Sequence, residues 1–120
     1  VAGERAGADD DGLPAVTGYR VIERAGRQAA WLALFPQTGR THQLRVHAEA
    51  MGWPIAGDPI YGGDRARAIA RHLQLHARRI IIPRPDRQPP LDITAPVPDH
   101  MLPLMRLIGF DPETRDGAAA

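Results

Sequence analysis

The stretch TGRTHQLRVH, at residues 38–47, separates a strand-rich region before it from a helix and an ordered loop after it. A glycine-containing turn leads into a predicted helix over residues 42–51, for which Thr41 is the expected N-cap. The first N–H groups of a helix have no partner within it, and the helix dipole favours negative charge there. Arg40 lies just before that end and Arg45 lies one turn inside it. The stretch therefore predicts a compact site for a phosphate or a carboxylate.

Two segments before this stretch have the composition of β-strands. Residues 15–23 are β-rich and alternate in part, while residues 29–35 are largely apolar. Residues 25–27 lie between them and have the length of a hairpin turn, so we expect an antiparallel pair. Residues 1–14, with three glycines and three consecutive aspartates, predict a flexible N-terminal segment.

The segments after the predicted helix are shorter. Gly52 and Pro54 end that helix, and the many turn formers up to Gly63 predict an ordered loop. The expected elements that follow are a short helix over 64–71, a strand at the β-branched end of residues 72–82, and a linker or turn over 83–90. After these we expect an edge strand over 91–95, a helix over 99–108 that Gly109 ends, and a flexible tail over 111–120. The pattern favours an α+β fold, with a mixed, mainly antiparallel sheet and short flanking helices.

Composition limits the classes of function. The chain has 120 residues, which suits one small domain, and it has no cysteine for a disulfide, a thiolate metal site or a nucleophile. No apolar run approaches the roughly 20 residues that cross a bilayer, so we expect a soluble, cytoplasmic protein. All fifteen basic residues are arginine. A GC-rich genome explains this, and arginine also suits bidentate contacts to phosphate, so both interpretations stay open.

Four segments in order resemble one protein family. The stretch at residues 38–47 resembles the motif TGR[TS]HQ[IL]RVH of RluA-type RNA pseudouridine synthases. Residues 50–62, AMGWPIAGDPIYG, resemble the family's GxPIxGDxxYG stretch; residues 75–77 resemble its LHA strand, and residues 95–98 its APxP segment. The resemblance covers residues 15–110 and implies the C-terminal half of the pseudouridine synthase fold.

The resemblance implies a reaction and roles for particular residues. Such enzymes isomerise uridine to pseudouridine in ribosomal or transfer RNA without a cofactor or a metal, on a base extruded from its RNA context. Arg45 matches the basic residue that pairs with the catalytic aspartate, which it would keep ionised and oriented. Leu75 matches the aliphatic residue near the target ring. Arg40, His42 and Gln43 are expected to contact the RNA backbone or to serve as local scaffold.

The sequence also departs from the family. The catalytic aspartate belongs to a segment like HRLDxxTSG, and nothing in the 120 residues resembles it. The family's base-stacking tyrosine follows a lysine, and the chain has no lysine. We therefore expect this chain to be inactive without the N-terminal half of the domain. The absence of that half would expose strand edges and apolar surface, so self-association is expected.

Several residues have competing interpretations. Asp58 could replace the missing acid, but its place between Gly57 and Pro59 favours a turn residue that binds its own backbone. His72 and His76 have the spacing of a zinc pair, yet a third ligand is missing from the pattern, so no metal is expected. A basic cluster (Arg78, Arg79, Arg84 and Arg87) suits RNA phosphates or a solvated face equally well.

Two classes of function remain. The chain is part of an RNA-modifying isomerase, or it is a module that binds RNA or a phosphorylated ligand without catalysis. An HRLD-type segment in the upstream coding sequence would favour the isomerase.

Overall fold

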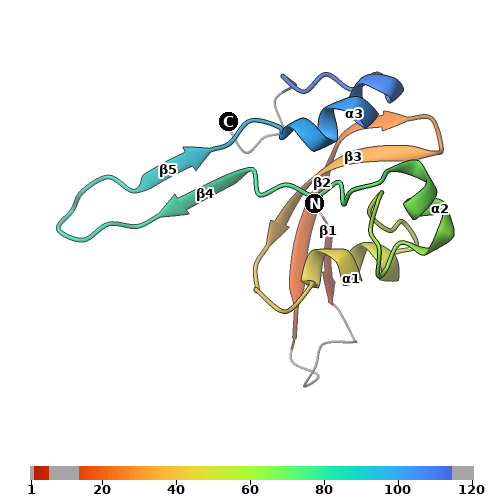
Figure 1. Cartoon of the computed structure of the whole chain (residues 1–120). Helices are drawn as coiled ribbons and strands as arrows, with labels where there is room; N and C mark the ends of the chain where they lie inside the picture. The colour runs from red at the N-terminus through yellow and green to blue at the C-terminus, as the bar shows by residue number, and fades with distance from the viewer. Residues whose placement is uncertain (1, 6–13, 115–120) are drawn as a thin grey trace. The chain divides into compact units, whose positions relative to one another are not determined.

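The computed structural model describes residues 2–5 and 14–114 (Figure 1). The chain divides into two compact units, Val1–Gln74 and Leu75–Ala120. Every strand ladder in the described part is antiparallel, and helices accompany both sheets, which confirms the α+β class. None of the described helices has the length and the apolar character to cross a membrane.

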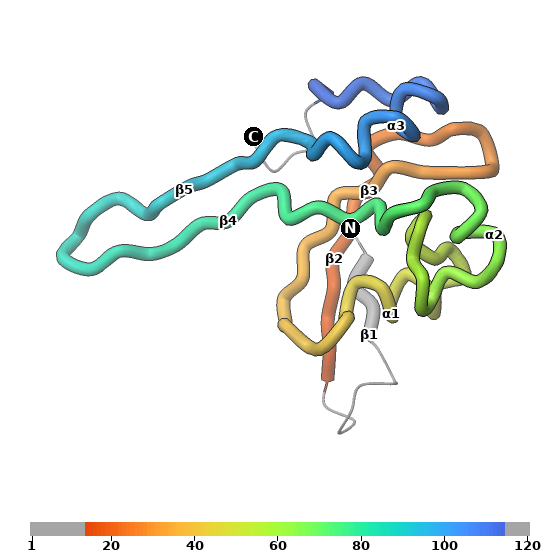
Figure 2. Tube along the Cα trace, viewed as in Figure 1, coloured from red at the N-terminus to blue at the C-terminus, as the bar shows by residue number. Residues whose placement is uncertain are grey.

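The first unit contains a three-stranded sheet in the order β1-β2-β3, which Figure 1 shows, and the β2–β3 hairpin can also be followed in Figure 2. Its strands are β1 (Ala2–Arg5), β2 (Val16–Ala25) and β3 (Ala29–Pro36). A tight turn joins β2 to β3, with Gly26 at a φ of 59°, where glycine is favoured. The predicted hairpin is therefore confirmed.

The N-terminal segment departs from the prediction. A flexible segment was expected over residues 1–14, but Ala2–Arg5 forms a strand that pairs with β2, from Ala2 opposite Tyr19 to Arg5 opposite Val16. A strand edge offers backbone N–H and C=O groups in a row, and these pair with another backbone almost regardless of its side chains. The prediction is wrong for β1, and residues 6–13 lie outside the described part.

Helix α1 (Gln43–Ala50) follows β3. The expected start at His42 with a Thr41 cap is wrong by one residue, because His42 is the N-cap and has a left-handed φ of 52°. The predicted stop at Gly52 is confirmed. Gly52 has a φ of 87°, and the N–H of Trp53 donates to the carbonyl of Ala48, which is the Schellman arrangement.

A loop then leads to helix α2 (Gly63–Ile69), close to the predicted 64–71. Gly57 lies in this loop at a φ of 78°, and its N–H donates to the carbonyl of Ala66. A Cβ atom on Gly57 would collide with the backbone carbonyl of His72. The loop is therefore packed backbone against backbone, which only glycine allows at this position.

The second unit contains a hairpin of β4 (Arg79–Ile82) and β5 (Leu91–Thr94). The strand expected at the β-branched end of residues 72–82 is confirmed as β4, whereas residues 75–77, which resemble the family's LHA strand, are not in a strand. Residues 83–90 connect the two strands, and the predicted edge strand over 91–95 is confirmed within one residue.

The two faces of this hairpin differ. One face carries four apolar side chains that are 39–56% exposed: Ile80, Ile82, Leu91 and Ile93. On the other face the guanidinium of Arg79 binds both carboxylate oxygens of Asp92, at 2.8 and 2.6 Å. The exposed apolar face is consistent with the expected self-association, which stays a prediction.

The basic cluster contacts its own hairpin. Arg78 donates to the carbonyl of Ala95, Arg79 pairs with Asp92, and Arg84 donates to the carbonyl of Pro89. Three of the four arginines thus stabilise the hairpin or the residue that follows it, and a contact of the cluster with RNA stays a prediction.

The predicted last helix begins as a 3-10 turn, η1 (Asp99–Met101), and continues as α3 (Leu102–Ile108). Gly109, at a φ of 85°, ends it as predicted. Among residues 75–114 of this unit, the buried side chains are Met101, Met105 and Phe110. Residues 111–114 form a turn, and the rest of the expected flexible tail lies outside the described part.

The packing at Gly57 generates a stability prediction. We expect Gly57→Ala to lower the free energy of unfolding much more than Gly26→Ala. Both positions have positive φ, which costs a non-glycine residue about 1–2 kcal/mol, but a Cβ on Gly26 meets no atom within 4 Å. Urea unfolding of both variants followed by circular dichroism measures the difference. Equal losses would contradict the close approach of the loop to His72.

Candidate functional site

The start of α1 is fixed by the side chain of Gln43. Its Oε1 accepts hydrogen bonds from the hydroxyl of Thr38 (2.6 Å) and the N–H of Arg40 (3.1 Å). Its Nε2 donates to the carbonyl of Val16 (3.0 Å) and to the hydroxyl of Thr17 (2.9 Å). All four hydrogen-bonding positions of the buried amide are therefore used within the chain. Of the two roles expected for Gln43, the structure shows the scaffold.

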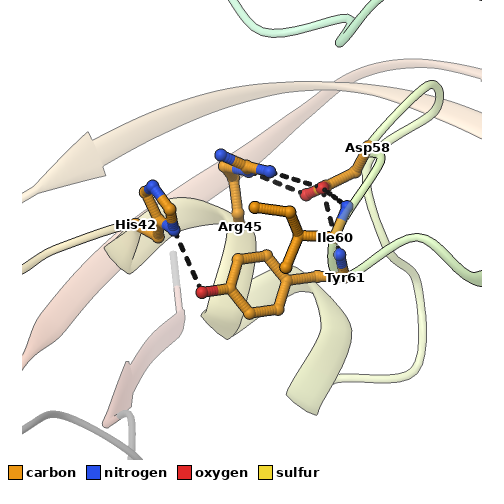
Figure 3. A network of polar contacts seen from close by, with 5 residues as sticks. All are labelled: His42, Arg45, Asp58, Ile60 and Tyr61. Carbon is orange, nitrogen blue, oxygen red and sulfur yellow. Dashed lines mark hydrogen bonds and ion pairs between the residues drawn. The ribbon is translucent and has the colours of Figure 1, made fainter.

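The centre of the candidate site is an ion pair between Arg45 of α1 and Asp58 of the following loop (Figure 3). Nε of Arg45 donates to Oδ2 of Asp58 at 2.9 Å, and Nη2 donates to Oδ1 at 2.6 Å. The side chain of Asp58 is 0% exposed and that of Arg45 is 13% exposed. A bidentate pair with so little exposure is among the stronger charge contacts in proteins.

Asp58 also organises its own loop. Its Oδ1 accepts the backbone N–H groups of Ile60 (3.0 Å) and Tyr61 (3.1 Å). The expectation that Asp58 is a turn residue bonded to its own backbone is therefore confirmed. The sequence did not predict that the same carboxylate binds Arg45, 13 residues away.

Tyr61 and His42 complete the network in Figure 3. The ring of Tyr61 faces the guanidinium of Arg45, with 5.2 Å between Cζ and the ring centroid, a cation–π contact. A hydrogen bond of 3.0 Å joins the hydroxyl of Tyr61 to Nδ1 of His42. The left-handed backbone conformation of His42 determines the direction in which its side chain leaves the backbone. Arg45 is thus held by a carboxylate and by an aromatic ring.

The charges of the pair support each other. Hydrogen bonds from Arg45 hold the pKa of Asp58 far below its usual range, against the opposing effect of burial. The N–H groups of Tyr61 and Ile60 and the positive charge of Arg45 lower it further. The hydrogen bonds to Asp58 likewise raise the pKa of Arg45. Both groups are therefore ionised in the folded chain.

The remaining predicted residues have different surroundings. Arg40 is half-buried, and its Nε donates to the carbonyl of Pro14 at 3.2 Å. Leu75 is half-buried and begins the second unit, whereas the network around Arg45 belongs to the first. Within residues 2–5 and 14–114, no three His, Asp or Glu side chains form a group that could hold a metal ion.

Asp58 and Tyr61 are the members of the network that sequence reasoning did not assign to it. The AGDPIYG stretch offers an acid 13 residues after Arg45, but the sequence does not distinguish it from the other acidic residues, and no signal pointed to Tyr61.

The ion pair generates a prediction with a matched control. We expect Asp58→Ala to lower the free energy of unfolding by about 3–5 kcal/mol, because it leaves a poorly solvated guanidinium without its partner. Asp64→Ala removes a pair of the same 2.6 Å length whose carboxylate is fully exposed, and it should cost less than about 1 kcal/mol. Chemical denaturation measures both. Similar losses would contradict the central role of the buried pair.

The lowered pKa of Asp58 predicts a pH dependence. A carboxyl group with a lower pKa in the folded chain stabilises it above the unfolded-state pKa of about 3.9, and this contribution is lost as the pH falls below that value. The stability difference between the native chain and Asp58→Asn should therefore be largest near pH 7 and shrink toward pH 3. Urea unfolding at several pH values tests this, and a difference independent of pH would exclude an ionised pair.

Comparisons with known proteins agree on one family. A family model described as RNA pseudouridylate synthase matches residues 2–50. The dual-specificity RNA pseudouridine synthase RluA of Escherichia coli K12 is 49% identical over 76 residues, which are 63% of this chain and 35% of that protein. An uncharacterized RNA pseudouridine synthase of Zymomonas mobilis is 42% identical over 98 residues, 81% of this chain and 43% of that protein.

The structural comparison agrees with the sequence comparisons. The solved structure of human RNA pseudouridylate synthase domain containing 1 superposes with a TM-score of 0.59 at 36% identity, covering 70% of this chain and 35% of that one. The chain thus spans 35–43% of the length of these relatives. Over that span, it belongs to the RluA-type RNA pseudouridine synthase family.

Proposed function

We propose that this chain supplies part of the active site of an enzyme that isomerises uridine to pseudouridine in ribosomal or transfer RNA. The observation that carries the proposal is Arg45, an ionised guanidinium held at the start of α1 within the stretch that resembles the family motif. The names of the relatives support the reaction, since each is called an RNA pseudouridine or pseudouridylate synthase.

The reaction exchanges one bond for another. The bond between N1 of uracil and C1′ of ribose breaks, the base rotates, and a bond forms between C5 and C1′. The proton on C5 is released and N1 gains a proton, so the product is an isomer of the substrate. The release of the C5 hydrogen makes turnover measurable with tritium.

The proposed role of Arg45 follows from its charge. In the family resemblance the nucleophile is an aspartate, and a cation beside it keeps that carboxylate ionised and oriented for attack. The 120 residues contain no HRLD-type segment to supply the aspartate. In this proposal the chain contributes the cation, while the role of Leu75 near the target base remains what the family resemblance implies.

A module that binds RNA without catalysis is the second candidate. The Arg45 guanidinium supports it, since a fixed cation at the start of α1 suits a phosphate as well as a carboxylate. Binding of RNA by the natural gene product without any tritium release would support this candidate and contradict the first.

The first test compares two proteins on RNA labelled with tritium at uridine C5. We expect the natural gene product that contains this chain to release tritium and the 120-residue chain alone to release none. Arg45→Met in the natural product should lower kcat by about a hundredfold or more, the cost of losing one preorganised electrostatic contact. Arg67→Met is the control, because Arg67 is exposed and binds only at the surface of α2.

Two outcomes would contradict the proposal. Tritium release by the 120-residue chain would mean that another residue supplies the nucleophile. Full activity of Arg45→Met would mean that the guanidinium takes no part in the reaction.

A further inference from the structure

The guanidinium of Arg45 has donors that the ion pair does not use. An arginine has five N–H groups in a rigid plane, and the two bonds to Asp58 use one on Nε and one on Nη2. The other three, two on Nη1 and one on Nη2, point away from Asp58. The described part of the chain gives these three no acceptor. One end of the guanidinium is thus available to a second anion.

Asp58 is held in place without the help of Arg45. Its backbone N–H donates to the carbonyl of Ile55 at 3.1 Å, and its own carbonyl accepts the N–H of Gly62 at 3.2 Å. Its Oδ1 accepts the N–H groups of Ile60 and Tyr61. A fully buried carboxylate with this many backbone contacts is a rigid anchor for the more flexible arginine side chain.

Tyr61 restrains the same guanidinium from another direction. Figure 3 shows its ring beside Arg45 and its hydroxyl directed at His42. Asp58 accepts a hydrogen bond from the N–H of Tyr61. The same carboxylate therefore fixes both Arg45 and Tyr61, whose ring faces the guanidinium.

We propose that Asp58 is a positioning residue: it holds Arg45 side-on, so that the Nη1 end of the guanidinium is presented to a second anion. This inference rests on the proposed function, in which that anion is the carboxylate of the nucleophile. Asp58 itself contacts neither the substrate nor the reacting atoms in this account.

The charge of Asp58 and its positioning of Arg45 predict opposite effects on activity when the charge of Asp58 is removed. Asp58 neutralises much of the charge of Arg45, so a carboxylate that merely competed for the cation would weaken binding of the second anion. Removing its charge would then raise activity. A carboxylate that positions the cation has the opposite effect, because a preorganised donor stabilises a developing or attacking charge more than a mobile one does.

Asp58→Asn separates these roles, because the two oxygens of Asp58 have different partners. The amide oxygen takes the place of Oδ1 and still accepts from Ile60, Tyr61 and Nη2 of Arg45. The amide nitrogen takes the place of Oδ2, where it opposes the N–H of Nε. The loop and the bond from Nη2 are preserved, whereas the bond from Nε is lost, so Arg45 keeps one contact and can turn about it.

The kinetic experiment uses the natural gene product and the tritium-release assay. We expect Asp58→Asn to lower kcat by about tenfold to a hundredfold, by analogy with the residues that orient metal ligands, with little change in KM. Asp64→Asn, which alters the exposed pair on α2, should leave both constants unchanged. In an Arg45→Met background, Asp58→Asn should have no further effect, since Asp58 acts through Arg45.

An unchanged or raised kcat for Asp58→Asn would overturn the proposal. So would a further loss in the Arg45→Met background, because it would assign Asp58 a role independent of the arginine.

A second measurement does not depend on activity. In ¹⁵N NMR spectra of the 120-residue chain, the Nε–H of Arg45 should be protected from solvent exchange, and Asp58→Asn should abolish this protection while backbone signals of other residues are retained. If the natural product releases no tritium, the proposed function fails, and the spectra alone decide whether Asp58 holds Arg45. Equal protection of the Arg45 Nε–H in the native chain and in Asp58→Asn would show that Asp58 does not hold Arg45.

Discussion

The Arg45–Asp58 ion pair is the contact on which the rest of the site depends. A carboxylate with no exposure and a guanidinium with little exposure are each costly to remove from water, and each is tolerated because the other is present. The pair connects α1 to the loop before α2, across 13 residues of sequence. The turn at Asp58 and the placement of Tyr61 follow from the same carboxylate. One group thus determines both the shape of the loop and the direction of the cation.

The interior of the first unit is unusually polar for its size. Among the described residues, its buried side chains are three alanines and four polar or charged groups: Ala15, Ala48, Ala66, Thr17, Gln43, His47 and Asp58. Alanines bury little apolar area, so the hydrophobic effect does little to select one arrangement over another. Hydrogen bonds are directional, and the saturated amide of Gln43 accepts one geometry between α1 and β2. The start of α1, and with it Arg45, is therefore placed by polar contacts.

This organisation agrees with a site assembled from separate parts of a longer sequence. The chain covers 35–43% of the relatives that match it, and it brings a fixed cation rather than a recognisable nucleophile. In the proposed function this cation faces a carboxylate from another segment, and a preorganised cation stabilises such a charge more than a mobile one does. The hydrogen bonds of Arg45 fit this role, since its Nε–Nη2 edge binds Asp58 and its Nη1 end has no acceptor among residues 2–5 and 14–114.

Local signals in the sequence determined the β2–β3 hairpin, the glycine stops of α1 and α3, the turn at Asp58 and the family itself. Each depends on residues close together in the chain, whose backbone preferences are readable without a fold. The tertiary structure decided the pairing of β1 with β2, the inward direction of Gln43 and the partner of Arg45. These contacts join residues that are distant in sequence, and no periodicity marks which of fourteen acidic residues will lie beside a given arginine. Only the folded chain brings Asp58 to Arg45, because that choice depends on how the loop packs and not on the residues themselves.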